Sequence, residues 1–134
     1  MNIAAMLISQ HLASLQMMEQ AIVDCPEADW DNAADANRSW HIAFHALHFV
    51  HEYLADDAGS FTPWAGHRPG YEEFDLPEEE YEPYDKATLL EYVAFLRGHV
   101  VERLSQMDLA GNYDPRLTRL ERQINSIRHM MEHV

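Results

Sequence analysis

The sequence has a single cysteine and few basic residues. The first shortage indicates the cellular compartment, and the second excludes some classes of binding partner. Cys25 has no partner for an internal disulfide, which is typical of a reducing compartment, so we expect a cytoplasmic protein. Nine Lys and Arg residues stand against 23 Asp and Glu residues, which gives a formal net charge of -14. This charge repels phosphate groups and therefore excludes nucleic acid and anionic lipid as expected partners.

The sequence also lacks a long hydrophobic run. No stretch reaches about 18 uninterrupted apolar residues, so no membrane span is predicted. Residues Met1 to Met18 contain no Lys or Arg and carry polar residues within the apolar pattern, which indicates an amphipathic helix rather than a signal peptide. A chain of 134 residues has the size of one domain with one core, so we expect a single domain over residues 1–134.

Apolar residues recur at helical spacing in four segments, and we find no convincing strand pattern. Asn37 or Ser39 is the expected N-cap of the second segment, and Asp85 is that of the third. Pro115 suits the first helical position of the fourth segment. These signals predict an all-α four-helix bundle. In chain order its helices are Ile3 to Val23, Trp40 to Leu54, the residues after Asp85 as far as about Met107, and Asp114 to Val134.

The segment from Asp56 to Tyr84 is far longer than the roughly two to eight residues that usually connect helices in a bundle. We therefore expect it to cross from one end of the bundle to the other. Its aromatic residues predict an ordered loop with solvated acidic side chains, and the alternative is a lid or a partner surface. These aromatic residues are Phe61, Trp64, Tyr71, Phe74, Tyr81 and Tyr84.

The second predicted helix holds four of the nine histidines. At 3.6 residues per turn, one stripe of this helix carries His41, His45, His48 and Glu52. A second face carries Trp40, Ala43, Phe44, Leu47, Val50 and Leu54. The polar face of a mostly buried helix therefore consists of imidazoles and one carboxylate. The lone histidines His11 and His99 are expected at polar or boundary positions.

The last predicted helix carries a second histidine pattern. His129 and His133 are four residues apart and therefore lie one above the other on one helix face. Such a pair can bind one divalent metal ion, and His45 or His48 is the natural third donor. Three protein ligands leave an open position, which is typical of a catalytic metal site. The alternative for this short motif is a pair of surface imidazoles.

The direction of the apolar seam conflicts with a buried histidine pair. The seam consists of Leu117, Leu120, Ile124, Ile127, Met131 and Val134. Its mean direction lies roughly 160° from His129 and His133 at the turn angle of an α-helix. Either the pair faces solvent, or the helix is buried on two sides. The second alternative motivates our expectation of a homodimer.

The order of these motifs resembles that of the DinB-like superfamily of metal-binding four-helix bundles. From Trp40 to His133, the matching stretches are WHIAFHALHFVHEYL, a long aromatic loop, EPYDKATLLEYVAFLRGHVVERL and RHMMEH. The resemblance implies an up-down-down-up bundle with three histidine ligands. His129 and His133 match the pair of the last helix. Spacing from Trp40 makes His45 the preferred third ligand, whereas a more general alignment selects His48.

The resemblance also implies a divalent metal, zinc or nickel before iron or manganese. It further implies a metal-dependent enzyme that uses a low-molecular-weight thiol in S-transferase or isomerase chemistry on a small-molecule substrate. The alternative is a non-catalytic metal-binding or stress-related dimeric scaffold. Glu132 and His51 depart from the residues that relatives often have there. Relatives also continue beyond Val134, so we expect His133 to be held loosely.

Overall fold

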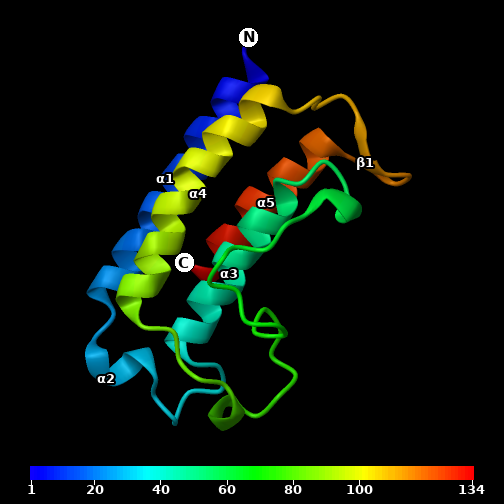
Figure 1. Ribbon diagram of the computed structural model, residues 1–134. Helices are drawn as coiled ribbons and strands as arrows, with labels where there is room; N and C mark the ends of the chain where they lie inside the picture. The colour runs from blue at the N-terminus through cyan, green and yellow to red at the C-terminus, as the bar shows by residue number, and fades with distance from the viewer.

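The computed structural model describes all 134 residues and is mainly helical. Four long helices make up most of the chain (Figure 1). They are α1 (Ile3–Asp24), α3 (Ser39–Tyr53), α4 (Lys86–Gln106) and α5 (Arg119–His133). A single further turn, α2 (Glu27–Trp30), lies between α1 and α3 in a segment for which no helix was predicted. The all-α prediction is thus confirmed in its main feature.

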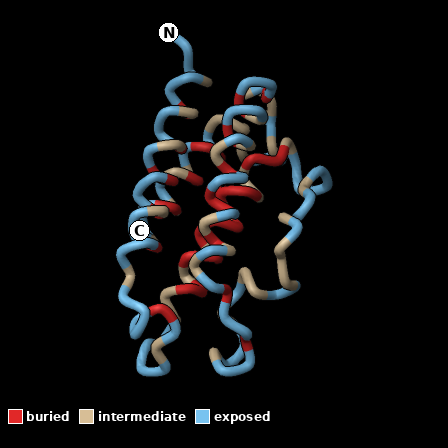
Figure 2. The backbone as a smooth tube through the Cα atoms, turned by 60° about the vertical axis from the view of Figure 1, so that its left-hand side comes forward, coloured by how far each residue is buried: buried red, intermediate tan, exposed pale blue.

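The four long helices lie side by side in two directions. α1 and α5 run from the end that carries the N-terminus, whereas α3 and α4 run back toward it (Figure 1). The most extensive contacts join α1 to α4 and α3 to α5. Figure 2 shows the buried residues gathered along the inner faces of these helices. The pairing of α3 with α5 sets the two histidine-bearing helices against each other.

The apolar face of α3 forms the centre of the core, as the helical periodicity predicts. All six residues of this face are buried, and Trp40 and Phe44 have no exposed surface. The Trp40 indole N–H donates to the Asp31 carboxylate at 2.9 Å, and Arg38 binds the same carboxylate. Neither predicted cap is present, because the N-cap position is Arg38 and no side chain caps the helix. Burial of Trp40 therefore anchors the start of α3.

The segment between α3 and α4 crosses from one end of the molecule to the other (Figure 1). It contains only two short 3-10 turns, Ala58–Ser60 and Glu78–Glu80. Its aromatic residues pack against the helices, and the Trp64 ring stacks on Tyr92 with ring centroids 4.2 Å apart. At its end, the Asp85 side chain accepts from the Thr88 N–H at 2.7 Å and caps α4 as predicted. The expectation of a crossover loop fixed by aromatics is confirmed.

The predicted start of the last helix at Asp114-Pro115 is wrong, as is the expectation of no strand. Residues Asn112–Asp114 (β1) and Leu117–Thr118 (β2) pair antiparallel, and α5 begins at Arg119. The Asp114 carboxylate accepts from the Arg116 N–H at 2.7 Å, which holds a turn at the proline. Thr118 then caps the helix by accepting from the Glu121 N–H at 3.1 Å. The pattern Thr-x-x-Glu is a helix-capping signal, and in the sequence it competes with the start signal at Pro115.

The apolar seam of α5 is only partly buried, contrary to the usual meaning of such a pattern, and Leu120 and Ile127 alone pack against the core. Ile124 and Met131 are 55% and 43% exposed. The residues of α5 that are buried are instead Arg122, Gln123, Ser126 and Met130. α5 therefore turns a mainly polar face inward, toward α3 and α1, and leaves part of its apolar seam exposed.

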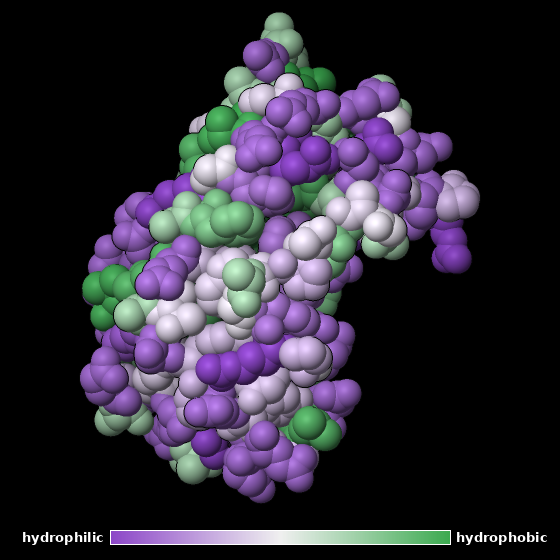
Figure 3. Space-filling model, in the orientation of Figure 1, coloured by the Kyte–Doolittle hydropathy of each residue, from purple (hydrophilic) through white to green (hydrophobic).

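Hydrophilic residues cover most of the face drawn in Figure 3, and hydrophobic residues form small separate groups on it. This distribution agrees with the excess of acidic residues in the sequence. None of the helices combines the length and the apolar character that crossing a bilayer requires.

Candidate metal centre

Three histidines from α3 and α5 converge between these helices. His45, His129 and His133 each offer a ring nitrogen, and these atoms all lie within 4.8 Å of one another. The His129 and His133 Nε2 atoms are 3.3 Å apart. The centroid of the His45 ring lies 5.3 Å from that of His129 and 4.9 Å from that of His133. The structure thus brings together the three residues that the resemblance to the DinB-like superfamily preferred.

The inward polar face of α5 explains how this convergence arises. Residues four apart on a helix lie one above the other, so His129 and His133 face α3 together. The seam lies roughly 160° from the pair, and its exposed residues, Ile124 and Met131, are the ones that meet solvent. Of the two alternatives for this helix, a surface location of the histidine pair is the wrong one. All three histidines are half-buried.

A backbone contact orients the His45 ring. Its Nδ1 atom lies 2.7 Å from the carbonyl oxygen of Glu72 in the crossover loop. A carbonyl oxygen only accepts, so Nδ1 carries the hydrogen and donates it. The lone pair on Nε2 is then directed away from the loop and is available to a metal ion. Histidine ligands in metal sites are commonly oriented in this way.

The local environment keeps these three imidazoles neutral. Burial lowers the pKa of His45, and the nearby imidazoles of His129 and His41 lower it further, against an opposing effect of the Glu72 carbonyl. Burial also lowers the pKa of His129 and of His133, each with a contribution from another histidine of the group. Their side chains therefore have a free lone pair at neutral pH, which is the form that binds metals.

The spacing of the nitrogens matches that of a metal site. Metal–nitrogen bonds of about 2.0–2.1 Å at tetrahedral angles place neighbouring ligand nitrogens about 3.3 Å apart. The Nε2 atoms of His129 and His133 are separated by 3.3 Å. In the absence of a metal the same two atoms can share a proton in an N–H···N hydrogen bond. Imidazole nitrogens suit several divalent transition metals, and three of them leave a coordination position open.

His48, the rival third ligand, lies in a different group. Its side chain is buried beside His67 and Glu72 of the crossover loop, with candidate ligand atoms within 4.8 Å of one another. Its Nε2 atom is also 3.5 Å from a carboxylate oxygen of Glu52. Periodicity alone could not separate His45 from His48, because they are one turn apart on the same stripe. The structure separates them, because the His67 and Glu72 side chains of the crossover loop lie beside His48, whereas His45 belongs to the three-histidine group.

His41 completes the polar stripe of α3 and has a different role. It has no exposed surface, and its ring stacks on Trp40 with centroids 4.7 Å apart. Its Nε2 atom donates to the Tyr71 carbonyl oxygen at 2.7 Å, and its Nδ1 atom lies 2.8 Å from a carboxylate oxygen of Glu78. His41 therefore fastens the crossover loop to α3 and does not join either histidine group.

A mostly apolar pocket of about 180 Å³ adjoins the three-histidine group. Its walls come from α1, α2 and α3. His133 lies at its edge and is the residue that the pocket shares with the three-histidine group. The residues that line it are Met18, Ala21, Ile22, Cys25, Trp30, Ser39, Ile42, Ala43 and His133. Sequence reasoning missed this pocket, because no local pattern links Cys25 to a histidine more than 100 residues later. A small apolar molecule placed here would lie beside the metal position.

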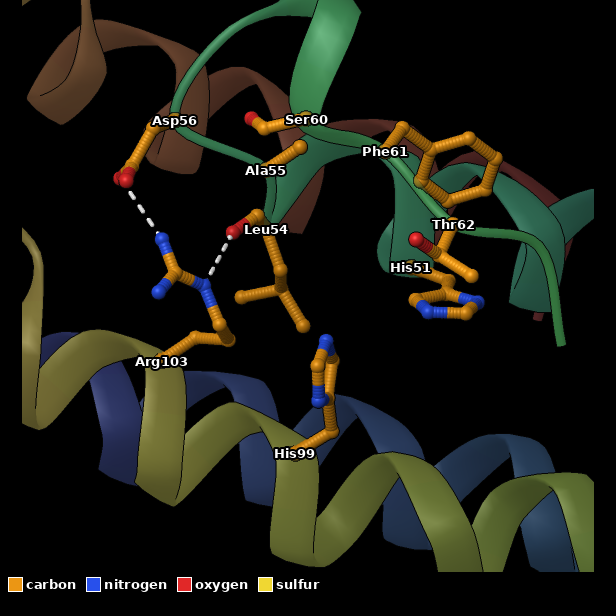
Figure 4. A pocket seen from close by; sticks show the side chains of 9 residues that line it. All are labelled: His51, Leu54, Ala55, Asp56, Ser60, Phe61, Thr62, His99 and Arg103. Atoms are coloured by element: carbon orange, nitrogen blue, oxygen red, sulfur yellow. Dashed lines mark hydrogen bonds and ion pairs between the residues drawn. The ribbon is translucent and has the colours of Figure 1, made fainter.

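A second pocket of about 220 Å³ lies between the end of α3, the start of the loop and α4 (Figure 4). The Arg103 guanidinium at its edge is already bound by the Asp56 carboxylate at 2.6 Å and the Leu54 carbonyl oxygen at 3.0 Å. His51, which lines the pocket, contacts the Tyr92 hydroxyl at 2.9 Å. Burial and three neighbouring histidines lower the pKa of His51 to about 4. The polar groups of this pocket are thus largely satisfied within the protein.

The prediction of a boundary position for His11 is wrong. His11 has no exposed surface, and its Nε2 atom donates to the Gln123 side-chain oxygen at 3.1 Å. The polar inward face of α5 makes this burial feasible, because it supplies an acceptor where an apolar helix face would not. His99 is half-buried at the edge of the second pocket, as expected of a boundary residue.

Neither a protein-family model, nor a curated protein, nor a solved structure matches the chain. The resemblance to the DinB-like superfamily therefore stays a prediction that rests on the order of the histidine motifs.

Proposed function

We propose that the protein binds a divalent metal ion through His45, His129 and His133. The observation that carries this proposal is the convergence of three neutral imidazoles within 4.8 Å from helices that lie some 80 residues apart in the sequence. The directions of the four long helices support the further proposal of an up-down-down-up bundle of the DinB-like type. Zinc and nickel are the expected metals, followed by iron and manganese.

A metal-dependent enzyme is the function that this site favours. A divalent metal with an open position supplies Lewis-acid chemistry and lowers the pKa of a bound thiol. The apolar pocket beside His133 would hold the carbon skeleton of a small electrophilic substrate. Its walls would exclude water from the reacting groups. The proposed reaction is therefore S-transfer or isomerisation with a low-molecular-weight thiol.

A dimeric scaffold is the second candidate, and a specific surface favours it. An apolar groove of about 360 Å³ lies between α1 and α5 and is lined by Ile3, Met6, Leu7, Gln10, Leu120, Ile124 and Ile127. No charged side chain lines this groove, although the chain carries a net charge of -14. The occupant that we propose is a second copy, which would present the same uncharged face around a two-fold axis.

The metal proposal is tested by metal analysis of the full chain purified without an affinity tag and reloaded with zinc. His129→Ala should bind one equivalent less than the wild-type chain. His99→Ala is the matched control, since His99 is also half-buried but lies outside the group. Equal stoichiometry in the wild type and His129→Ala would contradict the proposal.

The enzyme proposal is tested by a panel of low-molecular-weight thiols with electrophiles of increasing size. Activity should require metal and should be lost in His133→Ala. Ala21→Phe should raise KM more than it lowers kcat, because it fills the pocket from an exposed position on α1. A metal-loaded chain without activity across the panel would favour the scaffold.

A further inference from the structure

A second group of candidate ligands lies one turn along α3 from the first. We propose that His48, His67 and Glu72 form a second divalent-cation site. Glu52, on the same helix as His48, would supply a fourth donor. This inference uses none of the side chains of the three-histidine group, so it stands or falls separately from the proposed function.

The candidate ligand atoms of the second group lie close enough together to contact a single ion. The His67 Nε2 atom is 2.9 Å from a carboxylate oxygen of Glu72, and the three candidate ligand atoms lie within 4.8 Å of one another. The imidazole rings of His48 and His67 are nearly parallel, at 25° with centroids 5.3 Å apart. A simple ion pair would bring together one imidazole and one carboxylate. Here two imidazoles and one carboxylate lie together, and Glu52 adds a second carboxylate 3.5 Å from His48.

The group is shielded from water. The side chains of His48, His67 and Glu72 are 6%, 14% and 23% exposed. Bringing two carboxylates close together in such a setting is unfavourable unless positive charge compensates them. Arg122 lies 3.7 Å from Glu52 but forms no ion pair with Glu72. A cation among the four side chains would compensate both carboxylates.

Both carboxylates are in the form that binds cations. The pKa of Glu52 is lowered, chiefly by the hydrogen bond from His48. Burial alone would raise the pKa of Glu72, but the hydrogen bond from His67 and the proximity of His48 lower it overall. Metal ligands must be deprotonated, so these carboxylates are ready to coordinate at neutral pH.

The donor types identify the class of cation. Two imidazole nitrogens with one or two carboxylate oxygens are typical ligands of zinc, iron(II) and manganese(II). Calcium and magnesium prefer shells made of oxygen alone. The expected ligand is therefore a first-row transition metal, in common with the first site. Its structural effect would be to fix the crossover loop to α3 through His67 and Glu72.

The test is the zinc stoichiometry of the full, tag-free chain, measured by equilibrium dialysis. The wild type should bind two equivalents, and His67→Ala and His133→Ala should bind one each. The double variant should bind none, and His99→Ala should still bind two. Circular dichroism of each variant establishes that it is folded.

Two outcomes separate this inference from the proposed function. If His67→Ala binds as many equivalents as the wild type, the second site is overturned and the first is unaffected. If His133→Ala binds as many as the wild type while His67→Ala binds one less, the proposed function fails and the second site stands.

A milder variant serves if loss of His67 disturbs the loop. Glu72→Gln keeps the size of the side chain and the backbone carbonyl that contacts His45. It should weaken binding of one zinc equivalent by at least about 10-fold, because substitution of an outer-shell partner alone has that effect. Unchanged affinity for both equivalents would overturn the second site.

Discussion

The two halves of α5 both turn polar side chains toward the other helices, but these side chains meet different partners. In the first half, the Gln123 side-chain oxygen accepts from His11 and its amide nitrogen donates to the Tyr53 carbonyl oxygen. In the second half, His129 and His133 face each other and His45. The first arrangement is a pair of hydrogen bonds that joins α5 to α1 and α3, whereas the second is a group of ring nitrogens close enough to contact a single ion.

The difference shows how an inward polar helix face can serve structure at one end and ligand binding at the other. An amide offers both a donor and an acceptor, so Gln123 can satisfy a histidine and a carbonyl at once. Neutral imidazoles each offer one lone pair, and three whose nitrogens lie within 4.8 Å of one another can bind a single cation. The first half should therefore control folding stability, and the second half should control metal binding.

The largest expected effect is the stabilisation by metal. Zinc at about 1,000 times its dissociation constant contributes about 4 kcal/mol per site, which would raise Tm on the order of 10 °C. This rise should shrink by several degrees in a His129→Ala/His133→Ala double variant. Gln123→Leu should lower Tm yet keep the full rise. Differential scanning calorimetry with and without zinc measures the rise in Tm for each protein. Equal rises in the wild type and the double variant would contradict the role of the second half in metal binding.

In the first half, acid should act through His11. Burial lowers the pKa of His11 to about 4, against the opposing effect of its hydrogen bond to the Gln123 side-chain oxygen. Between pH 6.5 and 4 the unfolded chain gains a proton on this residue that the folded protein does not, so stability falls by up to about 3 kcal/mol. His11→Gln keeps a donor and cannot titrate. Urea unfolding at pH 7 and pH 4.5 should show a smaller loss in the variant, and identical losses would contradict this role of His11.

Removal of the Gln123 amide should have the next largest effect. Gln123→Leu leaves the buried His11 nitrogen and the Tyr53 carbonyl oxygen without their partner, which should lower the free energy of unfolding by about 2 kcal/mol. Gln20→Leu is the matched control, because Gln20 is exposed on α1. The control should stay within about 0.5 kcal/mol of the wild type. Similar values for both variants would show that the hydrogen bonds of the first half contribute little.

The smallest effect on stability is expected on the outer face of α5. Ile124 is 55% exposed, so Ile124→Glu should change the free energy of unfolding by no more than about 0.5 kcal/mol. It should, however, abolish the proposed dimer by placing two carboxylates in an apolar contact. Light scattering should give a particle of twice 15.5 kDa for the wild type and 15.5 kDa for the variant. A wild-type particle of 15.5 kDa would refute the dimer.

Sequence patterns predicted most of the fold where local signals act alone. The periodicity of α1, α3 and α4 gave bounds close to those observed, and the Asp85 cap was identified correctly. At α5 two local signals competed, and the Thr118 capping pattern determined the start rather than Pro115. The burial of its apolar seam was predicted wrongly for a different reason. Periodicity says which residues share a face but not whether that face meets the core.

The candidate site was predicted in part for similar reasons. The spacing of His129 and His133 and the stripe on α3 follow from helix geometry, so the pair and its facing histidines could be proposed from sequence. The choice between His45 and His48 could not, since it depends on where the loop places Glu72 and His67. Loop residues follow no period, and their partners emerge only from the tertiary structure.

Glu72 contacts both histidine groups, since its carbonyl oxygen accepts from His45 and its carboxylate lies against His67. A cation on the carboxylate would hold this residue in place and thereby hold the His45 ring in its metal-binding orientation. Thermodynamic reciprocity then requires that each ion raise the affinity for the other by the same factor. One residue of the crossover loop would thus make the binding of two ions cooperative, although the two sites share no ligand side chain.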